Sequence, residues 1–279
     1  MKVTEEAATA AVVSDARFSV ARMPDGTRLR YFHQGSPEAP AILMLHGLSD
    51  SSFSFSRILP LIPRQYQAIA LDARGHGESE RPDTGCQLTE LASDALHVLE
   101  AARVSKAFVV GHSMGTFVAR TMAAMAPDRV AGLILLDPGP TGGNAVLQQL
   151  WDVVARLTDP VDPVFVREFQ VSCIERPVPP DFLDLVVQES LKLPAATWRA
   201  ALAGMMAYEP CEDRITCPAL VLGGDRDTVF SVSEMQAVAS GIPGGRLRIL
   251  EGIGHTPQWE DPRTTVDILL EELSQSRPT

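Results

Sequence analysis

A serine stands at the centre of a glycine-flanked turn between two apolar segments. The run from Lys106 to Gly115 reads K-A-F-V-V-G-H-S-M-G, with Gly111 two positions before Ser113 and Gly115 two positions after it. The apolar run predicts a buried strand, and residues Met114 to Ala126 predict a helix, so the chain turns within two residues. A Cβ at either glycine would clash in so sharp a turn. The turn strains the backbone of the serine and exposes its hydroxyl beside the helix N-terminus. This pattern favours a nucleophilic serine.

A serine hydroxyl is a weak nucleophile and needs a general base, which in turn needs an acid that fixes its tautomer. His255 follows the last predicted strand in G-I-G-H-T-P, and Asp227 follows the preceding strand in G-G-D-R-D-T. Loops that follow parallel strands gather at one edge of a sheet, where ligands bind. We therefore expect Asp227 and His255 to meet Ser113 at that edge.

Composition and charge exclude several other classes of site. The 279 residues include 24 basic and 35 acidic residues, for a formal charge of −11, and the absence of a basic run argues against nucleic acid as a partner. The chain has no metal-like spacing of Cys and His, and no glycine-rich phosphate loop. We therefore expect no metal, no cofactor and no nucleic-acid partner.

The N-terminal residues and the cysteines indicate the cellular compartment of the protein. Residues up to about Asp15 resemble a loose leader, and the apolar run from Ala7 to Val13 is too short and too alanine-rich for a secretory signal. No apolar segment is long enough to cross a bilayer, and the four cysteines stand far apart. We expect a soluble, cytoplasmic protein without a membrane partner; whether it forms a homodimer stays open.

The elements that must position these residues alternate between strand and helix. Arg17 to Met23 and Thr27 to His33 flank a Pro-Asp-Gly turn and predict an antiparallel hairpin at a sheet edge. The further predicted strands are Ala41–Leu45, Tyr66–Leu71, the strand before Ser113, Val130–Leu136, Ala219–Gly223 and Leu247–Leu250. The predicted helices among them are Ser52–Leu61, Leu88–Ala101, Met114–Ala126, Ser231–Ala239 and Pro262–Leu273. This alternation predicts an α/β fold, a mostly parallel eight-stranded sheet flanked by helices.

The strand pattern stops between residues 139 and 214, where prolines separate segments of helical character. The helices predicted there are Val146–Leu157, Pro163–Glu175, Pro180–Lys192 and Ala195–Ala207. An all-helical insert after the sixth strand is expected to lie over the carboxyl ends of the strands. We therefore predict a core domain of residues 1–138 and 215–279 and a helical cap of residues 139–214.

Several motifs occur in a characteristic chain order. They are His46-Gly47, Asp72-x-Arg74-Gly75-x-Gly77-x-Ser79, Gly111-x-Ser113-x-Gly115, Gly224-Asp225-Arg226-Asp227 and Gly254-His255. With them, nearly the whole chain resembles capped proteins of the α/β-hydrolase fold, such as soluble esterases, cofactor-free haloperoxidases and C–C bond hydrolases. The resemblance implies a catalytic triad of Ser113, Asp227 and His255. It also implies an oxyanion hole formed by the backbone N–H groups of Leu48 and Met114.

The resemblance leaves alternatives for some residues. Asp137 occupies the position that some family members use for the acid, or it caps the turn that follows. Asp225 can be a turn or cap residue. His46 is expected to hold the oxyanion loop, and Asp72 and Arg74 are expected to pair in a structural loop.

Substrate contacts are expected from the oxyanion loop, the cap and the last loop. The candidates are His46, Gly47, Trp151, Trp198, Met205 and Trp259. Their apolar and aromatic character favours a small to medium, largely apolar substrate. A basic cap residue that turned inward would instead indicate a substrate carboxylate; the candidates are Arg156, Arg167, Arg176, Lys192 and Arg199.

The resemblance implies a serine carboxylic ester hydrolase that acts on a small-molecule ester, monoester or lactone through an acyl-enzyme. Hydrolysis of a C–C bond in a vinylogous diketone and cofactor-free perhydrolysis use the same triad and stay open. A slow-turnover ligand receptor on the same fold is the alternative from another class. Epoxide hydrolase and haloalkane dehalogenase are disfavoured, because the family members with those activities carry aspartate at the position of Ser113.

Overall fold

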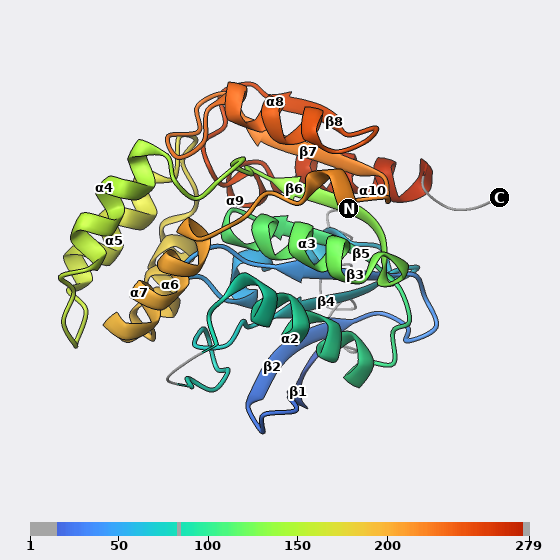
Figure 1. The fold of residues 1–279 in the computed structure, drawn as a ribbon, viewed down its shortest axis with the longest axis horizontal. Coiled ribbons are helices and arrows are strands. Elements are labelled where there is room, and N and C mark those ends of the chain that lie inside the picture. Colours follow the sequence, from blue (N-terminus) through green and yellow to red (C-terminus); the bar gives the residue numbers. More distant parts are fainter. Residues whose placement is uncertain (1–15, 83–84, 276–279) are drawn as a thin grey trace, which may run out of the picture.

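An eight-stranded sheet forms the centre of the molecule, with the strand order β1-β2-β4-β3-β5-β6-β7-β8 (Figure 1). The computed structural model describes residues 16–82 and 85–275, so the predicted leader up to Asp15 lies outside the described residues. β1 pairs antiparallel with β2 and β2 with β4, whereas every other pair is parallel. The strands are β1 (Arg17–Arg22), β2 (Arg28–Gln34), β3 (Ala41–Leu45), β4 (Gln67–Leu71), β5 (Ala107–His112), β6 (Val130–Leu136), β7 (Ala219–Gly224) and β8 (Arg246–Leu250).

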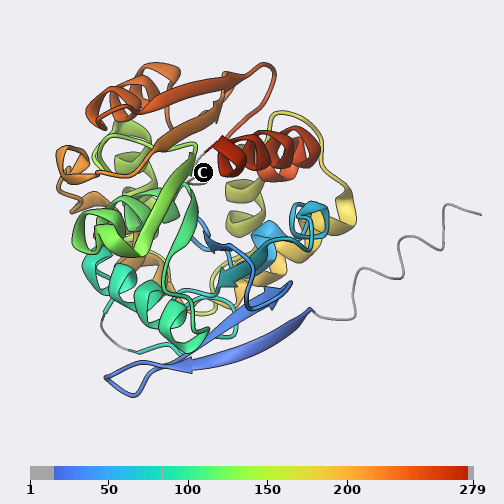
Figure 2. The same cartoon turned by 90° about the vertical axis from the view of Figure 1, so that its right-hand side faces the viewer.

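Helices cover both faces of the sheet, which confirms the predicted fold class. Figure 2 shows α2 and α3 on one side of the sheet and α10 on the other. The central strand β5 contributes Val109 to the core under α2 and α3 and Val110 to the core under α10. A strand buried on both faces needs this continuous apolar run. The helices of the core are α2 (Leu88–Ala101), α3 (Met114–Met125), α8 (Val232–Gly241), α9 (Pro257–Glu260) and α10 (Pro262–Gln275).

Four helices lie between β6 and β7, in the segment predicted as a cap, and Figure 1 shows them gathered beside one end of the sheet. They are α4 (Ala145–Val154), α5 (Pro163–Ser172), α6 (Pro180–Leu191) and α7 (Ala195–Met206). Arg120 of α3 is fully buried, donates to the Gly139 carbonyl at 2.8 Å and pairs with Glu212. The helix that follows Ser113 thereby holds both ends of this helical segment.

The single helix predicted over Ser52–Leu61 is wrong. The chain forms two short 3-10 helices, η1 (Ser52–Phe55) and η2 (Leu59–Leu61). Pro60 has no N–H to donate to an α-helical ladder. The Ser54 carbonyl, which such a ladder would use, accepts the Trp259 indole N–H at 2.9 Å instead. A tertiary hydrogen bond therefore competes with the local helical pattern.

The predicted pairing of Asp72 with Arg74 is also wrong. Arg74 makes a bidentate pair with the buried carboxylate of Asp94 on α2, at 2.5 and 2.7 Å. The Asp72 carboxylate accepts the backbone N–H groups of Ser52 at 2.7 Å and Glu78 at 3.1 Å. The long arginine side chain reaches a neighbouring helix, whereas the short aspartate satisfies the nearest backbone donors.

Two further expectations concern membrane-spanning helices and the state of the cysteines. None of the described helices combines the length and the apolar character that a bilayer crossing requires. All four cysteines are free thiols.

Candidate active site

Ser113 lies in the turn between β5 and α3 with a strained backbone, at φ 49° and ψ −113°. A Cβ on Gly111 would stand 2.4 Å from the Gly115 carbonyl oxygen, and a Cβ on Gly115 would stand 2.0 Å from the Leu45 carbonyl oxygen. The predicted need for glycine at both positions is confirmed. A positive φ at a non-glycine residue is costly and persists only where the surrounding packing enforces it.

A continuous series of hydrogen bonds joins the three predicted residues. His255 Nε2 lies 2.8 Å from Ser113 Oγ, and His255 Nδ1 lies 2.8 Å from Asp227 Oδ2. Because a carboxylate accepts, Nδ1 carries the proton, and Nε2 is free to accept the serine proton. Asp227 Oδ1 accepts the N–H groups of Val229 at 2.7 Å and Phe230 at 3.1 Å, which fixes the carboxylate. This is the arrangement of an activated nucleophile, its base and an orienting acid.

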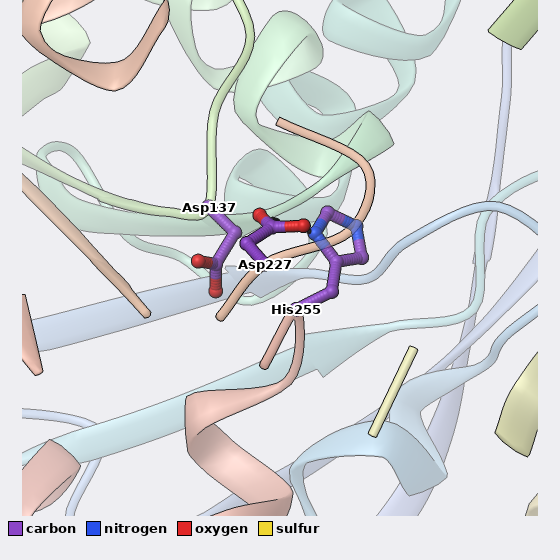
Figure 3. A group of neighbouring side chains, drawn as sticks. All are labelled: Asp137, Asp227 and His255. Atoms are coloured by element: carbon purple, nitrogen blue, oxygen red, sulfur yellow. Dashed lines mark hydrogen bonds and ion pairs between the residues drawn. The ribbon is translucent and has the colours of Figure 1, made fainter. Parts of the chain in front are cut away.

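Asp137 lies beside this series but does not bond the histidine. One side-chain ligand atom from each of Asp137, Asp227 and His255 lies within 4.8 Å of the other two, and Figure 3 shows the Asp227 carboxylate directed at the ring. Asp137 Oδ1 accepts the Gly224 N–H at 2.9 Å, so it bonds the end of β7 rather than the turn that follows Asp137. Asp225 accepts the Gly252 N–H at 2.7 Å, as expected for a turn residue.

Burial, followed by the neighbouring charge of Asp227, raises the pKa of Asp137 well above its usual range. Asp137 Oδ2 has no hydrogen-bond partner among the described residues, and when protonated it can donate to the neighbouring carboxylate. Burial and the neighbouring carboxylate therefore favour the protonated form of Asp137.

Replacing Asp137 with asparagine is expected to stabilise the fold at neutral pH. The pKa of this carboxyl group is higher in the folded state than its unfolded value of 3.8. The free energy of unfolding therefore falls as the pH rises from 3.8 to the folded pKa. Asparagine does not titrate and keeps an acceptor for Gly224. We therefore expect the variant to gain stability relative to the wild type as the pH rises from acidic to neutral values. Urea unfolding at pH 4.5 and 7.5 measures the change in the free energy of unfolding. A change that is the same at both pH values would contradict the raised pKa of Asp137.

Two backbone N–H groups are available near Ser113. Met114 opens α3, so its N–H has no acceptor within the helix. Leu48 lines the pocket beside Ser113. Among the described residues, neither N–H donates to a protein acceptor. Free, fixed donors beside a nucleophile can hold the negative oxygen of a tetrahedral intermediate.

His46 supports the loop that carries Leu48. Its Nε2 accepts the Ala73 N–H at 3.0 Å, so Nδ1 carries the proton and donates to the Gly47 carbonyl at 2.8 Å. Burial lowers the pKa of His46 to about 4, which keeps the ring neutral. The side chain is buried and does not line the pocket, which corrects its prediction as a substrate contact.

A cavity of about 140 Å³ opens beside Ser113 and His255. Gly47, Met205 and Trp259, all predicted as substrate contacts, line it. Apolar side chains from the cap complete much of its wall, among them Leu147, Leu150 and Phe169. A larger cavity of about 300 Å³ is lined by residues of β1, β2, η1 and their surroundings and by none of the three hydrogen-bonded residues. The smaller cavity is therefore the candidate active site.

Trp151 and Trp198 do not line this cavity, which corrects two predicted contacts. Trp198 is fully buried inside the cap, with its ring 5.5 Å from Phe165 and 5.3 Å from Phe169. Trp151 is half-buried and packs against the main apolar core. Each helix of the cap buries an apolar face against its neighbours, and these tryptophans belong to those faces.

The basic residues of the cap turn away from the cavity. Arg167 pairs with Asp184 at 2.7 Å, Arg176 with Asp261 at 2.9 Å, and Lys192 with Glu78 at 2.8 Å. Arg199 donates to the Leu157 carbonyl at 2.8 Å, and Arg156 is exposed. Within residues 16–82 and 85–275, no arginine or lysine lines the cavity.

Several polar residues that were not among the predicted substrate contacts also line the cavity, including Asp50, His112 and Gln170. Asp50 could have been noticed as an acidic residue in the loop after His46-Gly47, but the position of Gln170 depends on how α5 meets the core. Cys173 also lines the cavity, and burial raises the pKa of its thiol. A thiol without thiolate character is no competing nucleophile.

This chain is similar to several known proteins. The model of the "Alpha/beta hydrolase family" matches residues 42–268. An uncharacterized protein of Mycobacterium tuberculosis is 24% identical over 266 residues, which cover 86% of this chain and 76% of that protein. Epoxide hydrolase B of the same species is 35% identical over 127 residues, covering 44% of this chain and 35% of that protein. The solved structure of an esterase from Exiguobacterium antarcticum superposes with a TM-score of 0.81 at 21% identity and covers 92% of this chain and 99% of that one.

Proposed function

Because this chain belongs to the alpha/beta hydrolase family, we propose that it hydrolyses small, largely apolar carboxylic esters through Ser113, His255 and Asp227. One observation carries the proposal: a hydrogen-bonded series of nucleophile, base and acid meets a cavity with apolar walls. The reaction class follows from Ser113, the nucleophile of that series. A serine alkoxide attacks an acyl carbonyl and forms an ester that water can later cleave.

The mechanism begins with the proton on Ser113. His255 Nε2, 2.8 Å from Ser113 Oγ, accepts this proton as the oxygen attacks the acyl carbon of the substrate. Asp227 stabilises the resulting imidazolium and keeps Nδ1 protonated. The imidazolium then protonates the leaving alcohol, which leaves an acyl group on Ser113. Water, deprotonated by the same histidine, releases the acid.

The N–H groups of Leu48 and Met114 hold the carbonyl oxygen as it becomes negative. Their positions near the turn of Ser113 support this role. Fixed donors need no reorganisation during the reaction, and one such donor typically contributes about 3 kcal/mol to transition-state stabilisation.

The residues at the site favour ester hydrolysis over two other reactions of the family. Attack of a serine on an epoxide would leave an ether, which water does not cleave under mild conditions. The relative named an epoxide hydrolase therefore does not determine the reaction here. A ring-fission diketone carries a carboxylate, and among the described residues the cavity offers no arginine or lysine to bind it.

The size of the cavity limits the substrate. At about 140 Å³ it is close to the volume of roughly 150 Å³ that holds a benzene molecule in an engineered protein cavity. An acyl chain of about four to six carbons occupies a comparable space. The proposed substrates are therefore short esters.

Hydrolysis of a p-nitrophenyl ester series from acetate to decanoate tests the proposal. We expect kcat/KM to peak at a chain of about four to six carbons, because longer chains exceed the cavity. Diethyl p-nitrophenyl phosphate should inactivate the enzyme and label the peptide that contains Ser113. Folded protein that hydrolyses no ester and takes no label would overturn the esterase proposal.

A further inference from the structure

A buried carboxylate lines the candidate active site and has no basic side chain bonded to it among the described residues. Asp50 is 4% exposed; its Oδ2 accepts from Ser54 Oγ at 3.2 Å and its Oδ1 from Gln170 Nε2 at 3.2 Å. Burial raises the pKa of Asp50 to about 7. Buried acids are normally paired or fully hydrogen-bonded, so this carboxyl group retains capacity to bind a further partner.

His112 presents a second acceptor to the same cavity. Its Nε2 lies 2.8 Å from the His255 carbonyl oxygen, which can only accept, so Nε2 carries the proton. Burial, with the neighbouring His255 next in importance, lowers the pKa of His112 to about 3, and the ring is neutral. Its Nδ1 is therefore an acceptor, and it has no hydrogen-bond partner in the described part of the chain.

The two acceptors converge at Gly47. Asp50 Oδ2 and His112 Nδ1 are 3.9 Å apart, too far for a direct hydrogen bond. A Cβ on Gly47 would stand 3.0 Å from His112 Nδ1 and 3.3 Å from Asp50 Oδ2. Gly47 places no side chain between the two atoms, and all three residues line the cavity. A small donor group placed between the two acceptors can reach both.

The cap keeps this pair of acceptors in place. Gln170 of α5 is 1% exposed, and its Nε2 also lies 2.8 Å from Ser190 Oγ on α6. It donates to Asp50 Oδ1, which leaves Oδ2 directed toward His112. A side chain held by this buried network is already oriented for a ligand, so little entropy is lost on binding.

We propose that Asp50 and His112 form a subsite for a hydrogen-bond-donating group of the substrate, a hydroxyl or a primary amine. The preferred substrates are then short hydroxy or amino esters rather than purely aliphatic ones. This inference rests on the proposed esterase function. A hydroxyl bridges the two residues by accepting from protonated Asp50 and donating to His112 Nδ1. An ammonium donates to both the Asp50 carboxylate and the ring nitrogen.

Matched ester pairs test the subsite. On the acyl side, p-nitrophenyl hexanoate is compared with the p-nitrophenyl esters of 5-hydroxypentanoate and 5-aminopentanoate, in which the terminal methyl group is replaced, and shorter homologues scan the position. On the alcohol side, ethylene glycol monobutyrate is compared with propyl butyrate by acid release. We expect at least one donor ester to exceed its methyl partner about tenfold in kcat/KM, since an unpaired buried acceptor is costly.

Variants assign this preference to Asp50. Asp50→Ala should reduce the tenfold ratio to about one. Asp50→Asn preserves the size of the side chain and an acceptor but loses the charge, so it should abolish a preference for amines and spare one for hydroxyls. Ser172→Ala is the matched control, because Ser172 lines the same cavity but donates to the Phe169 carbonyl and bonds neither Asp50 nor His112. Its ratio should match that of the wild type.

The outcomes separate the subsite from the esterase proposal. Normal turnover of methyl esters with equal ratios in wild type and Asp50→Ala would overturn the subsite and leave the esterase proposal intact. If no ester is hydrolysed, the esterase proposal fails, and calorimetry of the Ser113→Ala variant with 1-hexanol and hexylamine tests the subsite alone. The subsite would then be overturned if adding Asp50→Asn or Asp50→Ala did not weaken the binding of hexylamine, or if adding Asp50→Ala did not weaken the binding of 1-hexanol.

Discussion

Replacing Ser113 with alanine is expected to lower kcat for short p-nitrophenyl esters by about five to six orders of magnitude, the loss found when a serine hydrolase loses its nucleophile. The hydroxyl 2.8 Å from His255 Nε2 is the atom that attacks, and no other described group at the site replaces it. The fold should be little affected, because the substitution removes a single oxygen atom and adds none. Steady-state kinetics at high enzyme concentration measures the residual rate.

Cys173→Ala is the matched control for this prediction. Its thiol lines the same cavity and is buried, yet burial raises its pKa and leaves it without thiolate character. We expect the variant to keep its activity within about threefold, which corresponds to well under 1 kcal/mol in the barrier. Retention of more than about 1% activity in Ser113→Ala would contradict the role of Ser113.

Replacing Asp227 with asparagine is expected to lower kcat by about four orders of magnitude, the effect of presenting the wrong group to the histidine. Asp227 Oδ2 accepts the proton of His255 Nδ1 at 2.8 Å. An amide at this position can turn its NH2 group toward the ring and favour the tautomer that protonates Nε2. The histidine would then be unable to accept the proton of Ser113. Pre-steady-state acylation with p-nitrophenyl butyrate measures the loss directly.

Asp137→Asn is the control that separates the two candidate acids. Both carboxyl groups lie near the histidine, but only Asp227 bonds the ring, and Asp137 bonds Gly224 instead. We expect Asp137→Asn to change kcat by less than about tenfold, or about 1.4 kcal/mol in the barrier. A larger loss in Asp137→Asn than in Asp227→Asn would make Asp137 the acid of the series.

The elements that position the site could be predicted because their signals are local. The strand before Ser113 is a continuous apolar run, and the turn needs glycine on both sides for steric reasons visible in the chain itself. The strand β3 and the helix α2 were predicted with the bounds that the structure has. Each depends on neighbours within a few residues, which a sequence pattern records directly.

The local pattern failed where a distant group competes with it. Ser52–Leu61 has helical character, but the indole of Trp259 takes the Ser54 carbonyl from the opposite end of the chain. Trp198 was predicted as a substrate contact, yet Phe165 and Phe169 enclose its ring inside the cap. An apolar residue on a cap helix can face the cavity or its own neighbours, and composition does not distinguish the two.

The sequence by itself determined the α/β fold class and the chain order of Ser113, Asp227 and His255, because turn sterics and apolar periodicity act between near neighbours. Only the tertiary structure decided which acid bonds the histidine and which polar groups line the cavity. Gln170 and Asp50 are separated by 120 positions, and His112 and His255 by 143. Contacts of this kind arise when packed elements bring separate loops together, and no spacing along the chain encodes them.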